Sequence, residues 1–193
     1  MIKYSLIFFM MLSACVFAQT KNWENRFIDA MNYKDGVSIN VKIDQMQFDL
    51  KSSDLGLIEI MDKDNYLLDF SNETVFVSEG IIKTFNKVNN QLIIDQLIEG
   101  DITIFDLLTG NFKDVLFENP DKRGNSIFVN FNIKMMGYSG FIKTKENGEP
   151  LELKVKYGPD QFLLLTVTNY IKGNLKLINE FNPLNAQIID LRE

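Results

Sequence analysis

Alternating apolar and polar residues dominate this chain and restrict it to a sheet-rich fold. Every second residue is apolar in two long stretches, 37–43 and 127–135. Such alternation is typical of a strand that has one face in a core and the other in water. After Asp44 the apolar residues change to the other face, which predicts a bulge or bend at that point.

Turn signals separate many such strands. Further strands are predicted at 55–61, 65–70, 141–144, 151–157, 161–171 and 175–181, with three more inside 75–95. The predicted turns are Asp62–Asp64, Ser78–Gly80, Lys87–Asn90, Glu146–Pro150 and Lys172–Asn174. Short strands in immediate succession favour an antiparallel meander. A sheet of about ten strands curls strongly or approaches a barrel.

Two segments depart from the strand pattern. Residues 20–33 place Trp23, Phe27, Ala30 and Met31 on one face of an amphipathic helix that ends near Gly36. Segment 101–117 is apolar without alternation. There we expect a short helix capped by Asp101 or Thr103, an interruption at Gly110 and a second helical turn from Asn111. Segment 101–117 is either a plug in the core or a lid over a cavity.

The first eighteen residues have the form of a signal peptide. Lys3 supplies the positive charge, Tyr4–Met11 the apolar run, and Val16–Ala18 a cleavage site that leaves Gln19 first. The apolar run is too short to span a membrane. The predicted division is therefore a signal peptide at 1–18 and one domain at 19–193.

Cys15 supports a second interpretation of the same segment. Leu12–Cys15, Leu-Ser-Ala-Cys, has the form of a lipobox, in which the cysteine is lipidated and kept at a membrane. Export through cleavage after Ala18 is the preferred interpretation, and a lipid anchor at Cys15 is the alternative.

Composition excludes several kinds of chemistry. The chain has no histidine and a single cysteine, which removes Ser-His-Asp and Cys-His sites and most zinc sites. A formal net charge of -6 provides no overall basic field for nucleic acid. Any catalysis would have to use carboxylates, lysine or tyrosine, and no cofactor is predicted.

The acidic residues do not form a recognisable catalytic pattern. Asp62 with Asp64, and Glu146 with Glu149, lie at predicted turns, where solvation explains them. The calcium-loop glycine and distal glutamate are missing around Asp62. Gly137–Gly140 is a glycine-serine turn without a histidine partner. The sequence therefore predicts a protein that is not an enzyme.

Three motifs occur in a characteristic order. Val77–Gly80 forms a Ser-acid-Gly turn, and a strand ending at Asn86 follows it. Ile104–Phe112 (IFDLLTGNF) is the mid-chain apolar segment, and the chain ends with Phe181–Leu184 and Ile188–Arg192. Together with the export signal, these motifs resemble the LolA family of periplasmic lipoprotein carriers over nearly the whole mature chain.

That resemblance implies a mainly β fold with helices: a single-domain incomplete (open) antiparallel β-barrel covered by an N-terminal helix and a mid-chain helical lid. It implies that lipoprotein acyl chains bind in an apolar cavity. The implied partners are an inner-membrane ABC transporter and an outer-membrane acceptor, the implied location is the periplasm, and the implied state is a monomer.

The resemblance also suggests which residues do this work. Matching positions predict an acyl-chain cavity lined by Tyr66, Leu68, Phe70 and Phe76. The predicted underside of the lid consists of Phe105, Leu108 and Phe112. Family members often carry an arginine latch just before the strand equivalent to 66–70, but this chain has Asp62-Lys63-Asp64 there. Either Lys63 replaces the latch or the latch is absent.

Other functions stay open at the sequence level. A membrane-anchored acceptor of the same half-barrel fold would require a lipid on Cys15. A hydrolase or sugar-binding β protein would need two facing carboxylates in its largest cleft. A purely structural exported β protein would have a filled interior.

Overall fold

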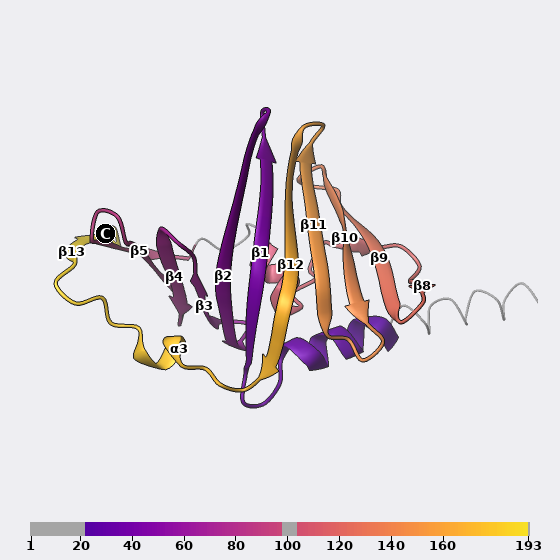
Figure 1. Ribbon diagram of the computed structural model, residues 1–193, viewed down its shortest axis with the longest axis horizontal. Coiled ribbons are helices and arrows are strands. Elements are labelled where there is room, and N and C mark those ends of the chain that lie inside the picture. The colour runs from indigo at the N-terminus through magenta and orange to yellow at the C-terminus, as the bar shows by residue number, and fades with distance from the viewer. Residues whose placement is uncertain (1–21, 98–103, 193) are drawn as a thin grey trace, which may run out of the picture.

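A single sheet of thirteen strands organises the protein (Figure 1). The computed structural model describes residues 22–97 and 104–192. The strands are β1 (Val37–Gln47), β2 (Leu50–Asp62), β3 (Asn65–Asp69), β4 (Glu73–Ser78), β5 (Ile81–Asn86), β6 (Gln91–Gln96), β7 (Leu116–Phe117), β8 (Asp121–Arg123), β9 (Ser126–Ile133), β10 (Tyr138–Lys145), β11 (Pro150–Gly158), β12 (Gln161–Lys172) and β13 (Gln187–Asp190).

The sheet is an open barrel rather than a closed one. Its order is β13-β6-β5-β4-β3-β2-β1-β12-β11-β10-β9-β7, with β8 paired to β9, so β13 and β7 lie at opposite edges. All neighbours are antiparallel except β13, which runs parallel to β6. The predicted incomplete antiparallel barrel with helices is confirmed.

Alternation along the strands divides the sheet into two faces. Ile39, Val41 and Ile43 are buried on the inner face, which the helices cover, whereas Lys42 between them is exposed. A register shift against β12 falls between Asn40 and Val41. The bulge predicted at Asp44 is therefore wrong. The pattern changes there because the strand continues past the core, so its inner face no longer needs apolar residues.

The predicted N-terminal helix is present at 22–31 and packs on the inner face. Trp23, Phe27 and Met31 are buried in the core, and the Trp23 indole donates a hydrogen bond to Thr144 Oγ1 at 3.1 Å. The Tyr170 hydroxyl donates to the carbonyl of Ala30. These bonds join both ends of the helix to the half of the sheet that contains β10 and β12.

The segment after β12 differs most from the prediction. Residues 175–181 do not form a strand: α3 (Leu177–Glu180) lies there instead. Glu59 on β2 causes this, because its buried carboxylate accepts hydrogen bonds from the amides of Lys176 at 3.0 Å and Ile178 at 2.7 Å. In a strand the amides of residues i and i+2 lie about 6.6 Å apart, too far to bond both oxygens of one carboxylate, whereas the first turn of a helix brings them close enough.

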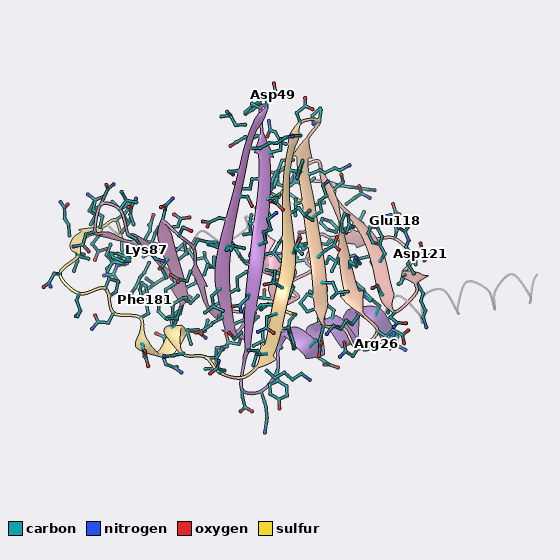
Figure 2. All side chains as sticks on the ribbon, viewed as in Figure 1. Arg26, Asp49, Lys87, Glu118, Asp121 and Phe181 are labelled. Atoms are coloured by element: carbon teal, nitrogen blue, oxygen red, sulfur yellow. The ribbon has the colours of Figure 1, made fainter. Side chains whose placement is uncertain are left out.

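The chain then crosses the outer face and returns to the sheet. Phe181 packs against Phe76 with ring centroids 5.1 Å apart, and β13 then pairs with the edge of β6. We call residues 175–192 the C-terminal strap. In Figures 1 and 2 the strap runs below the short strands, with α3 and Phe181 beside them.

Candidate functional site

The candidate site is the inner face of the sheet together with α2 (Ile104–Thr109), the predicted lid. Apolar side chains from β1, β2, β3, β4, β9, β10, β11 and β12 form one continuous cluster on this face. Leu107 and Leu108 of α2 are buried in that same cluster. Gly110, at φ 80°, ends the helix, and the second helical turn predicted from Asn111 is absent.

Aromatic contacts join the lid to the sheet and to the N-terminal helix. The ring of Phe105 stacks on Tyr66 of β3, with centroids 6.1 Å apart and planes 27° from parallel. Phe112, just after α2, stacks with Trp23 at 6.3 Å and meets Phe117 edge to face at 4.8 Å. The lid thus covers the inner face through offset aromatic and aliphatic packing, which has no strict directionality.

The lid has a polar link in addition to these apolar contacts. Asn32, just after the N-terminal helix, donates one hydrogen bond from Nδ2 to the carbonyl of Thr109 at 3.2 Å. The Thr109 hydroxyl and the Asn111 amide bond back to Asp106 within the lid itself. Asn32 thus ties the last turn of α2 to a neighbouring element.

Tyr66 places a phenol hydroxyl within this packing, beneath Phe105. Burial, and secondarily the negative charge of Asp106, raises the pKa of Tyr66 to about 12. The phenol therefore stays neutral at physiological pH, so no charge opposes the apolar character of the face.

Three of the four predicted cavity residues share the inner face. Tyr66 and Leu68 are buried in the cluster, and Phe70 packs against it. The Phe70 ring lies over Gly56, where a Cβ would come within 2.4 Å of it. Phe76 lies elsewhere: it is opposite Leu67 and Lys83 in the register, on the outer face beneath Phe181.

The predicted underside of the lid also has described positions. Leu108 is buried, and Phe105 and Phe112 are half-buried against the cluster. Sequence reasoning missed Leu107, which is as buried as Leu108. It also missed that the lid meets Trp23 and Phe27, because contacts between distant apolar segments leave no signal in local periodicity.

Lys63 lies in the turn between β2 and β3. Its ammonium pairs with Asp64 at 3.7 Å and its side chain is 70% exposed. The neighbouring Asp62 carboxylate accepts hydrogen bonds from the Asp64 amide and the Asn65 side chain, so it shapes the turn. Among the described residues, no group of three or more acidic or sulfur side chains could hold a metal ion.

Comparison with known proteins extends the description of the fold. No protein-family model matches the chain, and no curated protein matches it. An uncharacterized conserved protein from Thermus thermophilus has a similar structure, with a TM-score of 0.60 and 12% identity. The match covers 89% of this chain and 98% of that one. At this identity the likeness concerns the fold alone.

Two further solved structures match this chain with lower TM-scores. MucB matches with a TM-score of 0.51 and 12% identity, over 86% of this chain and 62% of MucB. A LolA superfamily protein from Nitrosomonas europaea matches with a TM-score of 0.45 and 9% identity, over 81% of this chain and 94% of that one.

Within the described residues, no helix has both the length and the apolar character needed to cross a membrane.

Proposed function

We propose that this protein is a periplasmic carrier of lipoproteins. In this proposal it holds the acyl chains of its cargo against the inner face of the sheet, beneath α2. It receives the cargo from an inner-membrane ABC transporter and delivers it to an outer-membrane acceptor as a monomer. The motif order and the open half-barrel with an apolar inner face support this proposal.

The observation that carries the proposal is the apolar contact between the lid and the inner face. Leu107 and Leu108 share one cluster with Tyr66 and Leu68, and Asn32 adds a hydrogen bond to Thr109 at the end of the lid. Moving each CH₂ into water costs roughly 0.8 kcal/mol, so one long acyl chain represents on the order of 10 kcal/mol. Hydrocarbon can replace the apolar side chains of the lid on this face without leaving a buried polar group unpaired.

The lid needs a means of closure other than an arginine. Lys63 pairs with Asp64, so we propose that Asn32 and the Tyr66–Phe105 stack hold α2 in place. Each contributes about 1 kcal/mol. Closure of this strength keeps the empty face covered and still allows cargo to displace the lid.

The same proposal assigns no catalytic residue and no cofactor. Binding of hydrocarbon requires apolar surface and a movable cover rather than an acid, a base or a nucleophile. The Asp62 carboxylate accepts hydrogen bonds from the Asp64 amide and the Asn65 side chain, and this supports a structural role for Asp62 in the turn.

Release of a lipoprotein from the inner membrane tests the carrier function. Spheroplasts that hold a labelled lipoprotein are incubated with the purified protein, and a soluble complex is expected in the supernatant. Phe105→Glu places a charge beneath the lid and should abolish release. Phe128→Glu is the matched control, because Phe128 is also half-buried but lies on the outer face against Phe141. No release by the wild type, with no lipid bound, would reject the carrier function.

The second candidate function is a membrane-anchored acceptor, and the lipobox cysteine Cys15 is the observation that favours it. Both Cys15 and the predicted signal peptide lie outside the described residues. Mass spectrometry of the mature N-terminus distinguishes the two functions: a chain beginning at Gln19 supports the carrier, and a diacylglyceryl cysteine supports the acceptor.

A further inference from the structure

The longest strands end in turns that carry exposed apolar side chains. β1 and β2 are joined by Phe48-Asp49, and β11 and β12 by a turn that begins after Gly158. In Figures 1 and 2 these two hairpins extend furthest from the rest of the molecule, with Asp49 at the extreme tip. Phe48 is 70% exposed and Leu50 is 77% exposed.

The backbone at this tip is strained for the residues that it carries. Phe48 has φ 47° and Asp49 has φ 66°. A two-residue hairpin turn with two positive φ angles strongly prefers Asn-Gly, and a bulky aromatic residue is rare there. A strained, exposed phenylalanine is a feature that stability alone does not explain, and such outliers concentrate at functional sites.

Register places a third turn at the same end of the sheet. Gln47 pairs with both Leu50 and Gln161, so the first two tips are level. Ser139 pairs with Lys156, which brings the turn between β9 and β10 to that end as well. That turn contains Met135, whose side chain is 86% exposed. Beside it Tyr138 and Tyr157 meet edge to face at 4.9 Å. We call Phe48, Leu50, Met135 and Tyr157 the apolar rim.

The opposite end of the same strands has a different composition. Its turns are Asp62-Lys63-Asp64, Glu146-Asn147-Gly148-Glu149 and Lys172-Gly173-Asn174. The turns at both ends connect strands of the same sheet, and the polar turns of the opposite end show that a turn here does not require the apolar residues of the rim. The rim also carries the lysines Lys51, Lys134 and Lys156 next to the acids Asp49 and Asp160, within a chain of formal net charge -6.

We infer that the apolar rim docks the protein on the surface of a lipid bilayer. Separate side chains on projecting tips suit a fluid layer that closes around each one, whereas a folded partner requires a contiguous surface. Aromatic rings with a polar end favour the boundary between headgroups and acyl chains, and adjacent lysines favour anionic headgroups.

This inference deepens the proposed function, on which it rests. The strands of the inner face run to this rim, so docking brings one end of the lid-covered face to the membrane. Acyl chains could then pass between bilayer and inner face over a short path, without full exposure to water.

Vesicle binding by the mature form expected from the sequence, which begins at Gln19, tests the inference. Vesicles of phosphatidylethanolamine and phosphatidylglycerol in a 3:1 ratio, a composition that gives about one anionic lipid in four, are sedimented with the protein. The double variant Phe48→Asn/Leu50→Asn should lose about tenfold or more in partition coefficient. Leu184→Asn is the matched control: Leu184 is 76% exposed but lies in the C-terminal strap, so binding should be unchanged.

A spectroscopic readout shows whether the tip enters the bilayer. Phe48→Trp should give an emission blue shift and quenching by brominated lipids, against the constant signal of the buried Trp23. Absence of vesicle binding by the wild type, equal binding by the double variant, or no change in the emission of the introduced indole would each overturn the inference. A wild-type dimer that the double variant abolishes, without vesicle binding, would show instead that the rim joins two copies.

The experiments distinguish a failure of the membrane-docking inference from a failure of the carrier proposal. Binding of a fluorescent fatty acid reports on the inner face, and we expect the rim variants to keep it. Fatty-acid binding without vesicle docking would reject the rim alone. Vesicle docking without fatty-acid binding or lipoprotein release would reject the carrier function and leave the rim proposal standing.

Discussion

At the residue scale, single positions decide how closely the elements can approach. Tyr66 supplies a neutral ring beneath the lid because burial raises the pKa of its hydroxyl, which therefore stays protonated. Gly140 of β10 allows the neighbouring strand β11 to pass close by, because a Cβ there would lie 1.9 Å from the Lys154 carbonyl oxygen. Neither the neutral ring of Tyr66 nor the missing Cβ of Gly140 contributes a reactive group.

Tyr66 should make stability depend on alkaline pH. Its pKa rises from 10.0 to about 12 through burial first and Asp106 second. The resulting stability is complete below pH 10 and is lost as the pH rises to about 12. The free energy of unfolding in urea, measured between pH 8 and pH 12, should fall less steeply in Tyr66→Phe than in the wild type.

Tyr170 provides a comparison for that measurement. Burial, followed by the charges of Glu149 and Tyr33, raises its pKa to about 12 as well. Tyr170→Phe should therefore remove a similar part of the alkaline loss, and the double variant should remove more than either single variant. Identical pH profiles for the wild type and Tyr66→Phe would contradict the prediction.

Gly140→Ala should destabilise the protein by about 2 kcal/mol or more, because β11 or the Phe131 ring must move to admit the methyl group. The measurement is the free energy of unfolding in urea. Gly158→Ala is the control: its Cβ would meet nothing closer than 3.9 Å, and a change within about 0.5 kcal/mol is expected. Equal effects at the two positions would contradict this account.

At the element scale, the lid depends on its surroundings. Isolated helices as short as α2 are unstable in water, so α2 forms because Leu107 and Leu108 are buried and Asn32 holds its last turn. The C-terminal strap shows the same dependence, since α3 begins where the Glu59 carboxylate accepts two amides.

Asn32→Ala should loosen the lid without unfolding the sheet. The loss of the bond to Thr109 is worth about 1 kcal/mol, which corresponds to about fivefold faster amide exchange in α2. Hydrogen exchange followed by mass spectrometry measures this. Asn179→Ala removes a similar bond, from Asn179 to the Leu175 carbonyl in the strap, and should leave exchange in α2 unchanged. Unchanged exchange of α2 in Asn32→Ala would show that the packing alone holds the lid.

At the scale of the whole molecule, an open sheet has two edges that must be protected. The strap places β13 outside β6 over four residues, Gln187 to Asp190, so this edge of the sheet is a strand of only four residues. An uncovered edge presents unpaired backbone groups to a second chain. A short edge strand offers few backbone groups to a second chain, so the strap favours a monomer, the form that the proposed carrier function requires.

Truncation after Ala186 should expose the β6 edge while leaving α3 and Phe181 in place. We expect concentration-dependent dimers or larger species, because β6 can then pair with another chain. Size-exclusion chromatography with light scattering measures the mass. A truncated protein that stays monomeric at high concentration would show that β13 does not protect this edge.

The antiparallel strands, most of their turns and the N-terminal helix could be predicted from the sequence because each depends on local spacing, whereas the open barrel was implied by the family resemblance. Strand alternation repeats every two residues and helix faces about every four, so patterns at 37–43 and 23–31 are visible without a structure. The inner positions of Tyr66, Leu68 and Phe70 follow from that alternation once the strand is recognised.

The sequence by itself thus determined most of the long strands, and its lack of histidine excluded histidine-dependent chemistry. Only the tertiary structure decided which apolar residues meet. Val75, Phe76 and Val77 are consecutive, and successive side chains of a strand point to opposite faces. The local pattern therefore could not assign Phe76 to the outer face. It also could not predict that residues 175–181 contain the helix α3 and not a strand. Both depend on Phe181 and Glu59, which are distant in sequence and become neighbours only when the sheet folds.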